Sequence, residues 1–348
     1  MLLSNEKLAG ERDATNPVII GNADAPVKLV YVLAASHSGS TLLSLLLGSH
    51  PDTCTIGELK ATSLGEPERY LCSCGARIRD CAFWREVAAR MRKHGVEFDV
   101  ADARTDFREG TNRLAKFLLK PLHRAPALER LRDAALFFTP GWRRRLQVTM
   151  RRNRLFARTV CELYGARMIV DSSKIGLRLK YLLRDPGLDV KIVRLIRDGR
   201  AVALTYMRPH DFADASDPKL RCGGNPRHAG EAGRPMRVAA REWRRCNEEA
   251  ESVLATVEPS RFVAVRYEDL CLEPDNTLSR VFDFLGLDPG IRERDFRKRC
   301  RHVLGNGMRL DTTAEIRLDE RWKTILTPED LRTFDEIAGA LNRKYGYR

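Results

Sequence analysis

Short apolar runs alternate with longer amphipathic segments along this chain. Four of these runs, Val27–Ala34, Arg167–Asp171, Val190–Ile196 and the segment that begins with RFVAV at Arg261, have the length and composition of buried strands. A turn and a helical pattern follow each run. Strands that alternate with helices in this way predict an α/β fold with a doubly wound parallel sheet.

Periodicity near 3.6 residues predicts the helices. One helix is expected to begin near Ser40, one to follow the turn Ser172–Lys174 and run to about Arg184, and one to begin near Arg200. Further helices are expected over Ala82–Arg92, Arg104–Lys120, Met236–Val257, Asn276–Leu285 and Pro328–Tyr345. The stretch Pro209–Pro235 has no period and is rich in Gly, Pro, Asp and Arg, which is typical of a long loop with a function.

The length of 348 residues is sufficient for one large domain. We expect an N-terminal extension over residues 1–26 and a single domain over 27–348, with a basic, mostly helical insertion at about 66–165. The first residues lack the basic and then apolar pattern of a signal peptide, and no later run approaches the roughly 20 apolar residues of a membrane span. These features predict a cytoplasmic location.

Positive charge is concentrated in one part of the chain. The formal net charge is +14, and the segment from Arg113 to Arg158 holds thirteen Lys or Arg residues against Glu129 and Asp133, a local charge of +11. Such a field favours an anionic partner, whether nucleotide, acidic acceptor, membrane surface or nucleic acid. An ordinary solvated basic surface explains the same charge.

The nine cysteines do not indicate a disulfide framework in a chain without an export signal. Cys72, Cys74 and Cys81 cluster in LCSCGARIRDC, with Cys54 upstream. A Cys-x-Cys without a second close pair matches structural zinc spacing poorly. We therefore expect reduced thiols or one local disulfide rather than a metal site.

The turn after the first strand has the composition of an anion site. It reads Ala34-Ala35-Ser36-His37-Ser38-Gly39-Ser40-Thr41 and leads into a helix, whose unpaired N–H groups and dipole favour a phosphate. The turn resembles a nucleotide triphosphatase loop, but Ala34 replaces its first glycine and Ser40 replaces its lysine. Hydrolysis of ATP or GTP is therefore a poor interpretation.

A second anion motif follows the third predicted strand, in IVRLIRDGRAVALTYMR. Arg197 stands at the end of the strand, and Thr205 lies two helical turns further on. A guanidinium group offers a planar fork for phosphate oxygens, and a nearby hydroxyl can add another hydrogen bond. Taken alone, Arg197 is equally compatible with an ion pair to Asp198.

Together the two motifs resemble those of sulfotransferases that use 3′-phosphoadenosine 5′-phosphosulfate (PAPS), particularly the bacterial, carbohydrate and tyrosylprotein branches. HSGSTLL resembles the 5′-phosphosulfate loop, and RDGRAVALT resembles the 3′-phosphate motif. Val265–Leu287 resembles the late strand–turn–helix, and ERWKTIL with KYGY resembles the C-terminal part. The resemblance covers about residues 27–60 and 166–346. It implies a P-loop-like sheet and sulfuryl transfer from PAPS to a hydroxyl of a carbohydrate, lipid, small molecule or tyrosine. Since such a transfer needs mainly positioning, charge stabilisation and removal of one proton, we expect no required metal.

The resemblance also assigns residues to the donor. It implies 5′-phosphate binding by Ser38, Gly39, Ser40 and Thr41, 3′-phosphate binding by Arg197 and Thr205, and covering of the nucleotide by Tyr267, Arg321, Trp322 and Lys323. His37 stands where the family has Lys or Arg. A histidine there could donate a hydrogen bond to the leaving phosphate; otherwise Lys174 or Arg208 supplies the charge.

Glu58 is the candidate general base, since its spacing from His37 matches that in tyrosylprotein sulfotransferases. A loop glutamate that caps the following helix is the alternative, and His50 is the rival base, although a cap role suits its SHP context better. Lys174 is expected to reach the sulfuryl oxygens. Trp243 and Asn247 are expected to pack.

Two other classes of function are compatible with parts of the sequence. A P-loop small-molecule kinase would need Lys at position 40 and an acidic magnesium partner. A basic protein that binds nucleic acid or membranes would rest on Arg113–Arg158. We prefer the transferase, expect no nucleic acid partner, and expect Arg113–Arg158 to form a helical subdomain beside the acceptor cleft, with Arg143, Arg144 and Arg145 as the residues that test it.

Overall fold

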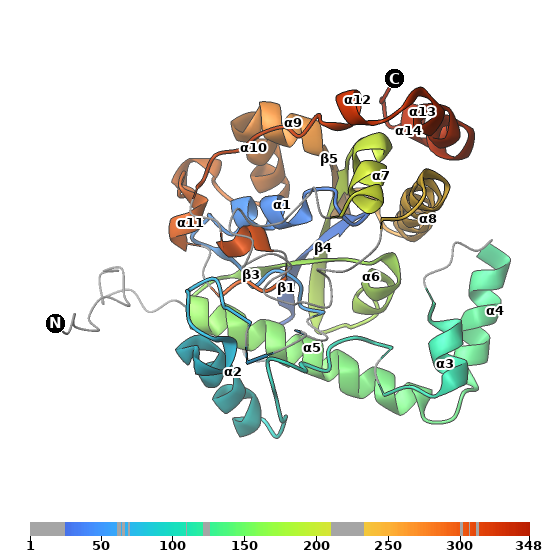
Figure 1. Cartoon of the computed structure of the whole chain (residues 1–348). Coiled ribbons are helices and arrows are strands. Elements are labelled where there is room, and N and C mark those ends of the chain that lie inside the picture. Colours follow the sequence, from blue (N-terminus) through green and yellow to red (C-terminus); the bar gives the residue numbers. More distant parts are fainter. Residues whose placement is uncertain are drawn as a thin grey trace.

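The computed structural model describes residues 25–60, 64, 67–68, 70–108, 110–120, 126–209, 233–299, 302–305, 307–310 and 313–348. Its centre is one five-stranded sheet in the order β2-β3-β1-β4-β5. Every neighbouring pair of strands is parallel, as Figure 1 shows. The strands are β1 (Val27–Ala34), β2 (Thr53–Thr55), β3 (Met168–Lys174), β4 (Leu188–Ile196) and β5 (Phe262–Arg266).

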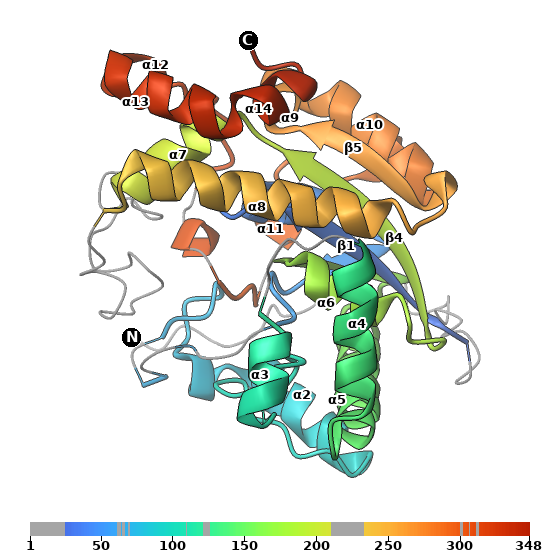
Figure 2. The ribbon, with the colours of Figure 1, turned by 90° about the vertical axis from the view of Figure 1, so that its right-hand side faces the viewer.

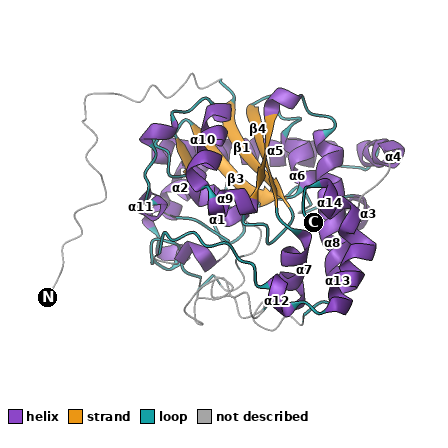
Figure 3. Cartoon of the chain, turned by 90° about the horizontal axis from the view of Figure 1, so that it is seen from above, coloured by secondary structure: helices purple, strands orange, loops and turns teal. Residues whose placement is uncertain are grey.

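Alternate side chains of β1 enter two different cores, as expected for a sheet covered on both faces. Leu29 and Tyr31 pack in a core that includes Phe156 of α5 (Trp142–Tyr164). Val30 packs in another core with Leu43 of α1 (Ser40–Leu47). Figure 3 shows the strands between helices on both sides. The doubly wound parallel sheet predicted from the sequence is confirmed.

The remaining helices are α2 (Ala82–Lys93), α3 (Arg113–Leu118), α4 (Pro126–Phe137), α6 (Gly176–Leu182), α7 (Gly199–Met207), α8 (Met236–Leu254), α9 (Tyr267–Leu272), α10 (Pro274–Leu285), α11 (Phe296–Arg299), α12 (Trp322–Ile325), α13 (Pro328–Phe334) and α14 (Ala340–Lys344). Helices α2, α6, α7, α8, α10, α13 and α14 lie where the sequence predicted helices, whereas α4, α9, α11 and α12, like α5, had no individual prediction. A π-helical turn over Asp335–Gly339 joins α13 to α14, so the expected C-terminal helix exists with a local irregularity. Among the described residues, no helix combines the length and the apolar character that a membrane span requires.

Two local predictions were wrong. The helix expected over Arg104–Lys120 is reduced to α3, because Arg104 has a positive φ of 52° and the Thr105 hydroxyl donates to the Leu59 carbonyl at 2.6 Å. These features hold residues 104–105 in a non-helical course beside the Leu59 backbone. The turn expected at Ser172–Lys174 is instead the end of β3.

The basic segment forms part of the connection between two strands of the sheet. Its last helix, α5, is the crossover from β2 to β3, and α2 packs against it in the same core. Figure 2 shows α2, α3 and α5 at the end of the molecule opposite α12, α13 and α14. The division into an extension over 1–26 and a domain over 27–348 stays a prediction, and residues 1–24 lie outside the described part.

Candidate active site

The predicted site residues follow the carboxyl ends of all five strands. Glu58 follows β2, Lys174 ends β3, the loop His37–Thr41 follows β1, Arg197 follows β4, and Tyr267 follows β5. Because the strands are parallel, these ends meet at one edge of the sheet, where ligands bind in open α/β folds. The strand order places Glu58 and Lys174 on one side of the loop, and Arg197 and Tyr267 on the other.

The loop after β1 is shaped for an anion. His37 and Gly39 have positive φ values of 63° and 87°, and a Cβ on Gly39 would lie 2.4 Å from Cδ2 of Tyr267. The position therefore requires glycine. Within the described part of the chain, the buried hydroxyl of Ser38 has no hydrogen-bond partner, and α1 has no side-chain cap. These donors fit a phosphate group.

Arg197 connects this loop to Asp319 and Tyr267. Its guanidinium donates to the His37 carbonyl at 2.9 Å and to Asp319 Oδ2 at 3.2 Å, and it lies 4.4 Å from the centre of the Tyr267 ring. Its Nε is buried and has no hydrogen-bond partner among the described residues. The Thr205 hydroxyl instead donates to the Ala201 carbonyl at 3.1 Å, within α7. The structure thus provides an arginine with a spare donor, and Thr205 would have to turn to join it.

Asp319 is a residue that the sequence reasoning missed. It accepts hydrogen bonds from Arg197 and, at 2.8 Å, from Arg321. Burial alone would raise the pKa of Asp319, but the hydrogen bonds from Arg321 and the charge of Arg197 hold it below its usual value. A carboxylate therefore neutralises part of the positive charge expected to receive a phosphate.

The next two residues, Trp322 and Lys323, make different contacts. The Arg200 guanidinium lies 4.1 Å from the centre of the Trp322 ring, which is a cation–π contact. Lys323 pairs with Glu320 on the surface. The covering of a nucleotide by Tyr267, Arg321, Trp322 and Lys323 stays a prediction.

On the other side of the loop, Glu58 and Lys174 form a direct ion pair. Backbone contacts fix the segment that carries Glu58: Ser172 N–H donates to Gly57 O at 3.0 Å, and Leu59 N–H donates to Asp171 Oδ1 at 3.1 Å. Lys174 itself has a positive φ of 70°. The structure therefore brings together two of the three predicted catalytic residues.

His37, the third, lies in the loop between these two sides. Its ring meets that of Tyr206 edge to face, with centroids 4.8 Å apart. Neighbouring strands are about 4.8 Å apart, so the ends of β1 and β3 bring His37 and Lys174 to the same edge. Both remain candidates for the charge beside a leaving phosphate. Arg208 is exposed just after α7, and residues 210–232 of the predicted loop lie outside the described part.

The ring of His50, the rival base, is held by two contacts with the backbone. It is fully buried, its Nε2 is 3.0 Å from the Asp288 carbonyl, and its Nδ1 accepts from Asp52 N–H at 3.0 Å. Burial lowers the pKa of His50, so the neutral ring with the proton on Nε2 is favoured. Both nitrogens are thus engaged with the backbone. Trp243 and Asn247 are fully buried, in agreement with their expected packing role.

Of the two expected states of the cysteines, reduced thiols or one local disulfide, the structure shows the reduced thiols. No described cysteine is in a disulfide, and Cys74 Sγ is 3.7 Å from Cys81 Sγ, far beyond the roughly 2.05 Å of a disulfide bond. His302, which the sequence reasoning did not single out, lies beside Cys72 and Cys81. His302 lies more than 200 residues after these cysteines in the sequence, so no motif spacing pointed to it.

Comparison with known proteins assigns this arrangement to a family. The model described as "Sulfotransferase family" matches residues 30–290. Carbohydrate sulfotransferase 2 of Homo sapiens is 28% identical over 185 residues, which are 45% of this chain and 34% of that protein. Carbohydrate sulfotransferase 6 of Homo sapiens is 25% identical over 332 residues, covering 92% and 80%.

The matched region therefore spans about a third of the first of these relatives. Among solved structures, the sulfotransferase domain from the curacin biosynthetic pathway superposes with a TM-score of 0.47 and 19% identity, and the match covers 93% of this chain and 99% of that domain.

Proposed function

The chain belongs to the sulfotransferase family, and we propose that it transfers a sulfuryl group from PAPS to a hydroxyl group of an acceptor. Family membership gives no support to the kinase alternative, which the serine at position 40 already disfavoured.

The pair of anion sites at the carboxyl edge of the sheet carries this proposal. The loop Ser38–Thr41 offers a buried hydroxyl and helix N–H groups to the 5′-phosphosulfate. Arg197, on the neighbouring strand, offers a buried Nε to the 3′-phosphate. A donor with phosphate groups at both ends of its ribose requires two such sites, whereas a simple nucleotide monophosphate requires one.

Orientation of the donor then follows from the strand order. With the 3′-phosphate toward β4 and β5, the sulfuryl group lies toward β3 and β2, where Glu58 and Lys174 are paired. We assign proton removal from the acceptor hydroxyl to the Glu58 carboxylate, and stabilisation of the sulfuryl oxygens to Lys174. His37 is assigned to the bridging oxygen. As in phosphoryl transfer, catalysis is mainly positioning and charge stabilisation.

The acceptor side adjoins the basic segment. Helix α6 begins just after Lys174, and its Lys180 donates to Asp133 of α4 at 2.8 Å. Exposed apolar side chains accompany the exposed Arg143–Arg145 in this region; they include Leu131, Phe137 and Phe138. Basic and aromatic side chains together suit an anionic membrane surface. We propose that this surface docks on anionic lipid and thereby presents the active site to its acceptor.

The donor assignment is tested with the product nucleotide, 3′-phosphoadenosine 5′-phosphate. A ligand that binds only the folded state stabilises it by roughly 2.7 kcal/mol at 100 times its Kd. We expect this nucleotide to raise the Tm more than 5′-AMP does, and Arg197→Ala to reduce the difference. The exposed Arg241→Ala is the matched control. Equal shifts from the two nucleotides would reject the 3′-phosphate assignment.

A further inference from the structure

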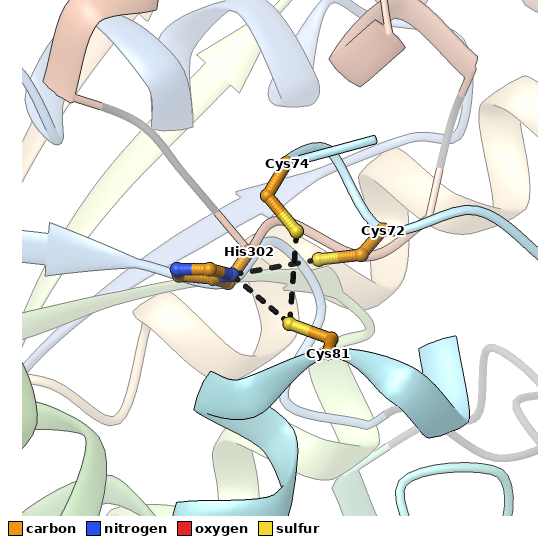
Figure 4. Close-up of side chains that lie close together, drawn as sticks. All are labelled: Cys72, Cys74, Cys81 and His302. Atoms are coloured by element: carbon orange, nitrogen blue, oxygen red, sulfur yellow. Dashed lines mark hydrogen bonds between the residues drawn. The ribbon is translucent and has the colours of Figure 1, made fainter. Parts of the chain in front are cut away.

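Four potential metal ligands meet away from the donor site. They are Cys72, Cys74 and Cys81, from the segment before and at the start of α2, and His302, from far along the chain. Figure 4 shows the three sulfur atoms and the imidazole directed toward one another. One ligand atom from each residue lies within 4.8 Å of all the others.

Three of the six distances between these ligand atoms match the edges of a zinc tetrahedron, and the other three lie within 4.8 Å. Bond lengths of about 2.3 Å for Zn–S and about 2.0 Å for Zn–N place sulfurs about 3.8 Å apart, and sulfur and nitrogen about 3.5 Å apart. Cys74 Sγ and Cys81 Sγ are 3.7 Å apart, and His302 Nδ1 is 3.6 Å from Cys72 Sγ and 3.3 Å from Cys81 Sγ. Three thiolates and an imidazole are typical ligands of a structural zinc site.

Local structure around the four residues fixes the positions of their side chains. Cys72 N–H donates to the Ala76 carbonyl at 2.9 Å, which closes a turn around Gly75, and this glycine has a positive φ of 88°. Cys81 is the N-cap residue of α2, where a thiolate gains from the helix dipole. The His302 ring stacks on Phe83, with centroids 4.4 Å apart.

We propose that Cys72, Cys74, Cys81 and His302 bind one structural Zn²⁺ ion. The protein supplies all four ligands, so no position is left for a water or substrate, and the ion takes no part in sulfuryl transfer. The sequence spacing disfavoured this site because its fourth ligand lies more than 200 residues away. Zinc would join these distant segments as a disulfide does, but in a reducing compartment.

The segments that carry Cys72 and His302 also contact the loop that carries Glu58. Ser73 Oγ accepts from Val303 N–H at 2.9 Å, and Leu304 N–H donates to the Ile56 carbonyl at 2.7 Å. A Cβ on Gly305 would lie 3.9 Å from Glu58 Oε1. The proposed ion therefore clamps residues 302–305 beside the loop that carries Glu58.

Metal analysis of the full-length protein tests the proposal. After purification under reducing conditions from zinc-supplemented medium, we expect about one zinc per chain. Replacement with Co²⁺ should give a thiolate-to-cobalt charge-transfer band and the visible bands of tetrahedral cobalt. Protein without stoichiometric metal, an iron–sulfur cluster, or a Cys74–Cys81 disulfide found by mass spectrometry would each overturn it.

Variants locate the metal. Cys74→Ser changes an exposed ligand and His302→Ala a half-buried one, so both are chosen to preserve folding. Each should lose most of the zinc during dialysis against a chelator and should have a lower Tm, whereas Cys246→Ser on α8 should keep both unchanged. Retention of full zinc by the double variant would exclude these ligands. Zinc content is read without PAPS, so this outcome is independent of the proposed function.

Discussion

The ion pair between Glu58 and Lys174 links the two charges that the proposed reaction needs. The Lys174 ammonium group contacts the Glu58 carboxylate directly, so the two groups lie side by side at the carboxyl edge of the sheet. If Lys174 turns to the sulfuryl oxygens when the donor binds, Glu58 is released toward the acceptor hydroxyl.

Substitution of Glu58 tests its role as the base. Glu58→Gln keeps the shape but cannot accept the proton, so turnover should fall by on the order of 10²–10⁴-fold. Binding of the product nucleotide, measured by its Tm shift, should be unchanged because Glu58 lies on the other side of the loop. The exposed Glu273→Gln is the control. Turnover close to that of the wild type would show that another group removes the proton.

Substitution of Asp319 should strengthen nucleotide binding. Its carboxylate shares Arg197 and Arg321 and would repel a 3′-phosphate bound to Arg197. Asp319→Asn should therefore bind 3′-phosphoadenosine 5′-phosphate several-fold more tightly, as measured by titration calorimetry. Affinity for 5′-AMP should change little, and Glu320→Gln, on the exposed neighbour, should leave both affinities unchanged. Weaker binding of the bisphosphate would mean that Asp319 helps to shape the site.

At the scale of elements, patterns within one segment were predictable and contacts between distant segments were not. The apolar run of β1 and the turn to α1 depend on local sequence, so their positions were confirmed. The three-residue β2 is too short for a periodic signal, and it exists because it pairs with β3. Residues 104–105 follow a tertiary hydrogen bond rather than their helical pattern.

The same distinction holds for the candidate site. Residues adjacent in sequence to a strand end, such as Ser38 and Arg197, could be singled out because strand ends meet at one edge. Asp319 and His302 could not, since each is brought to its cluster by chain folding alone.

The basic surface of α5 gives a prediction at this scale. Each Lys or Arg near an anionic membrane contributes about 1 kcal/mol, so changing Arg143, Arg144 and Arg145 together to Gln should weaken binding to phosphatidylserine vesicles by about 100-fold. Co-sedimentation with vesicles measures this, with phosphatidylcholine vesicles for comparison. A charge-matched control is Arg237, Arg241 and Arg244 of α8 changed to Gln.

Two results would contradict the lipid assignment. Wild-type protein that ignores phosphatidylserine vesicles would exclude docking on anionic lipid. A triple variant that binds vesicles normally but uses a soluble anionic acceptor poorly would assign the surface to the acceptor itself.

For the molecule as a whole, several ion pairs join separate elements and depend on ionised aspartates. Asp133 of α4 accepts from Lys180 at 2.8 Å and from Arg184 at 2.7 Å, and both of these belong to the α6 region. Burial alone would raise the pKa of Asp133, but hydrogen bonds from Lys180 and Arg184 hold it below its usual value. Asp106 is held low in the same way by Arg108. Burial raises the pKa of Glu249, which acts in the opposite direction.

These directions fix the sign of a dependence of stability on pH. A carboxyl whose pKa is lower in the folded than in the unfolded protein stabilises the fold above the unfolded value, and this contribution is lost as the pH falls through the folded value. For Asp133 the loss therefore begins below about pH 5, given an unfolded pKa near 3.9.

At pH 7, Asp133→Asn should lower the Tm by a few degrees, because it removes the ion pairs of Asp133 with Lys180 and Arg184. As the pH falls toward 3, the difference in Tm between the variant and the wild type should become smaller. Thermal unfolding followed by circular dichroism between pH 3 and pH 7 measures this, and the exposed Asp189→Asn should run parallel to the wild type. A constant Tm difference across the whole range would show that Asp133 acts through packing rather than through its charge.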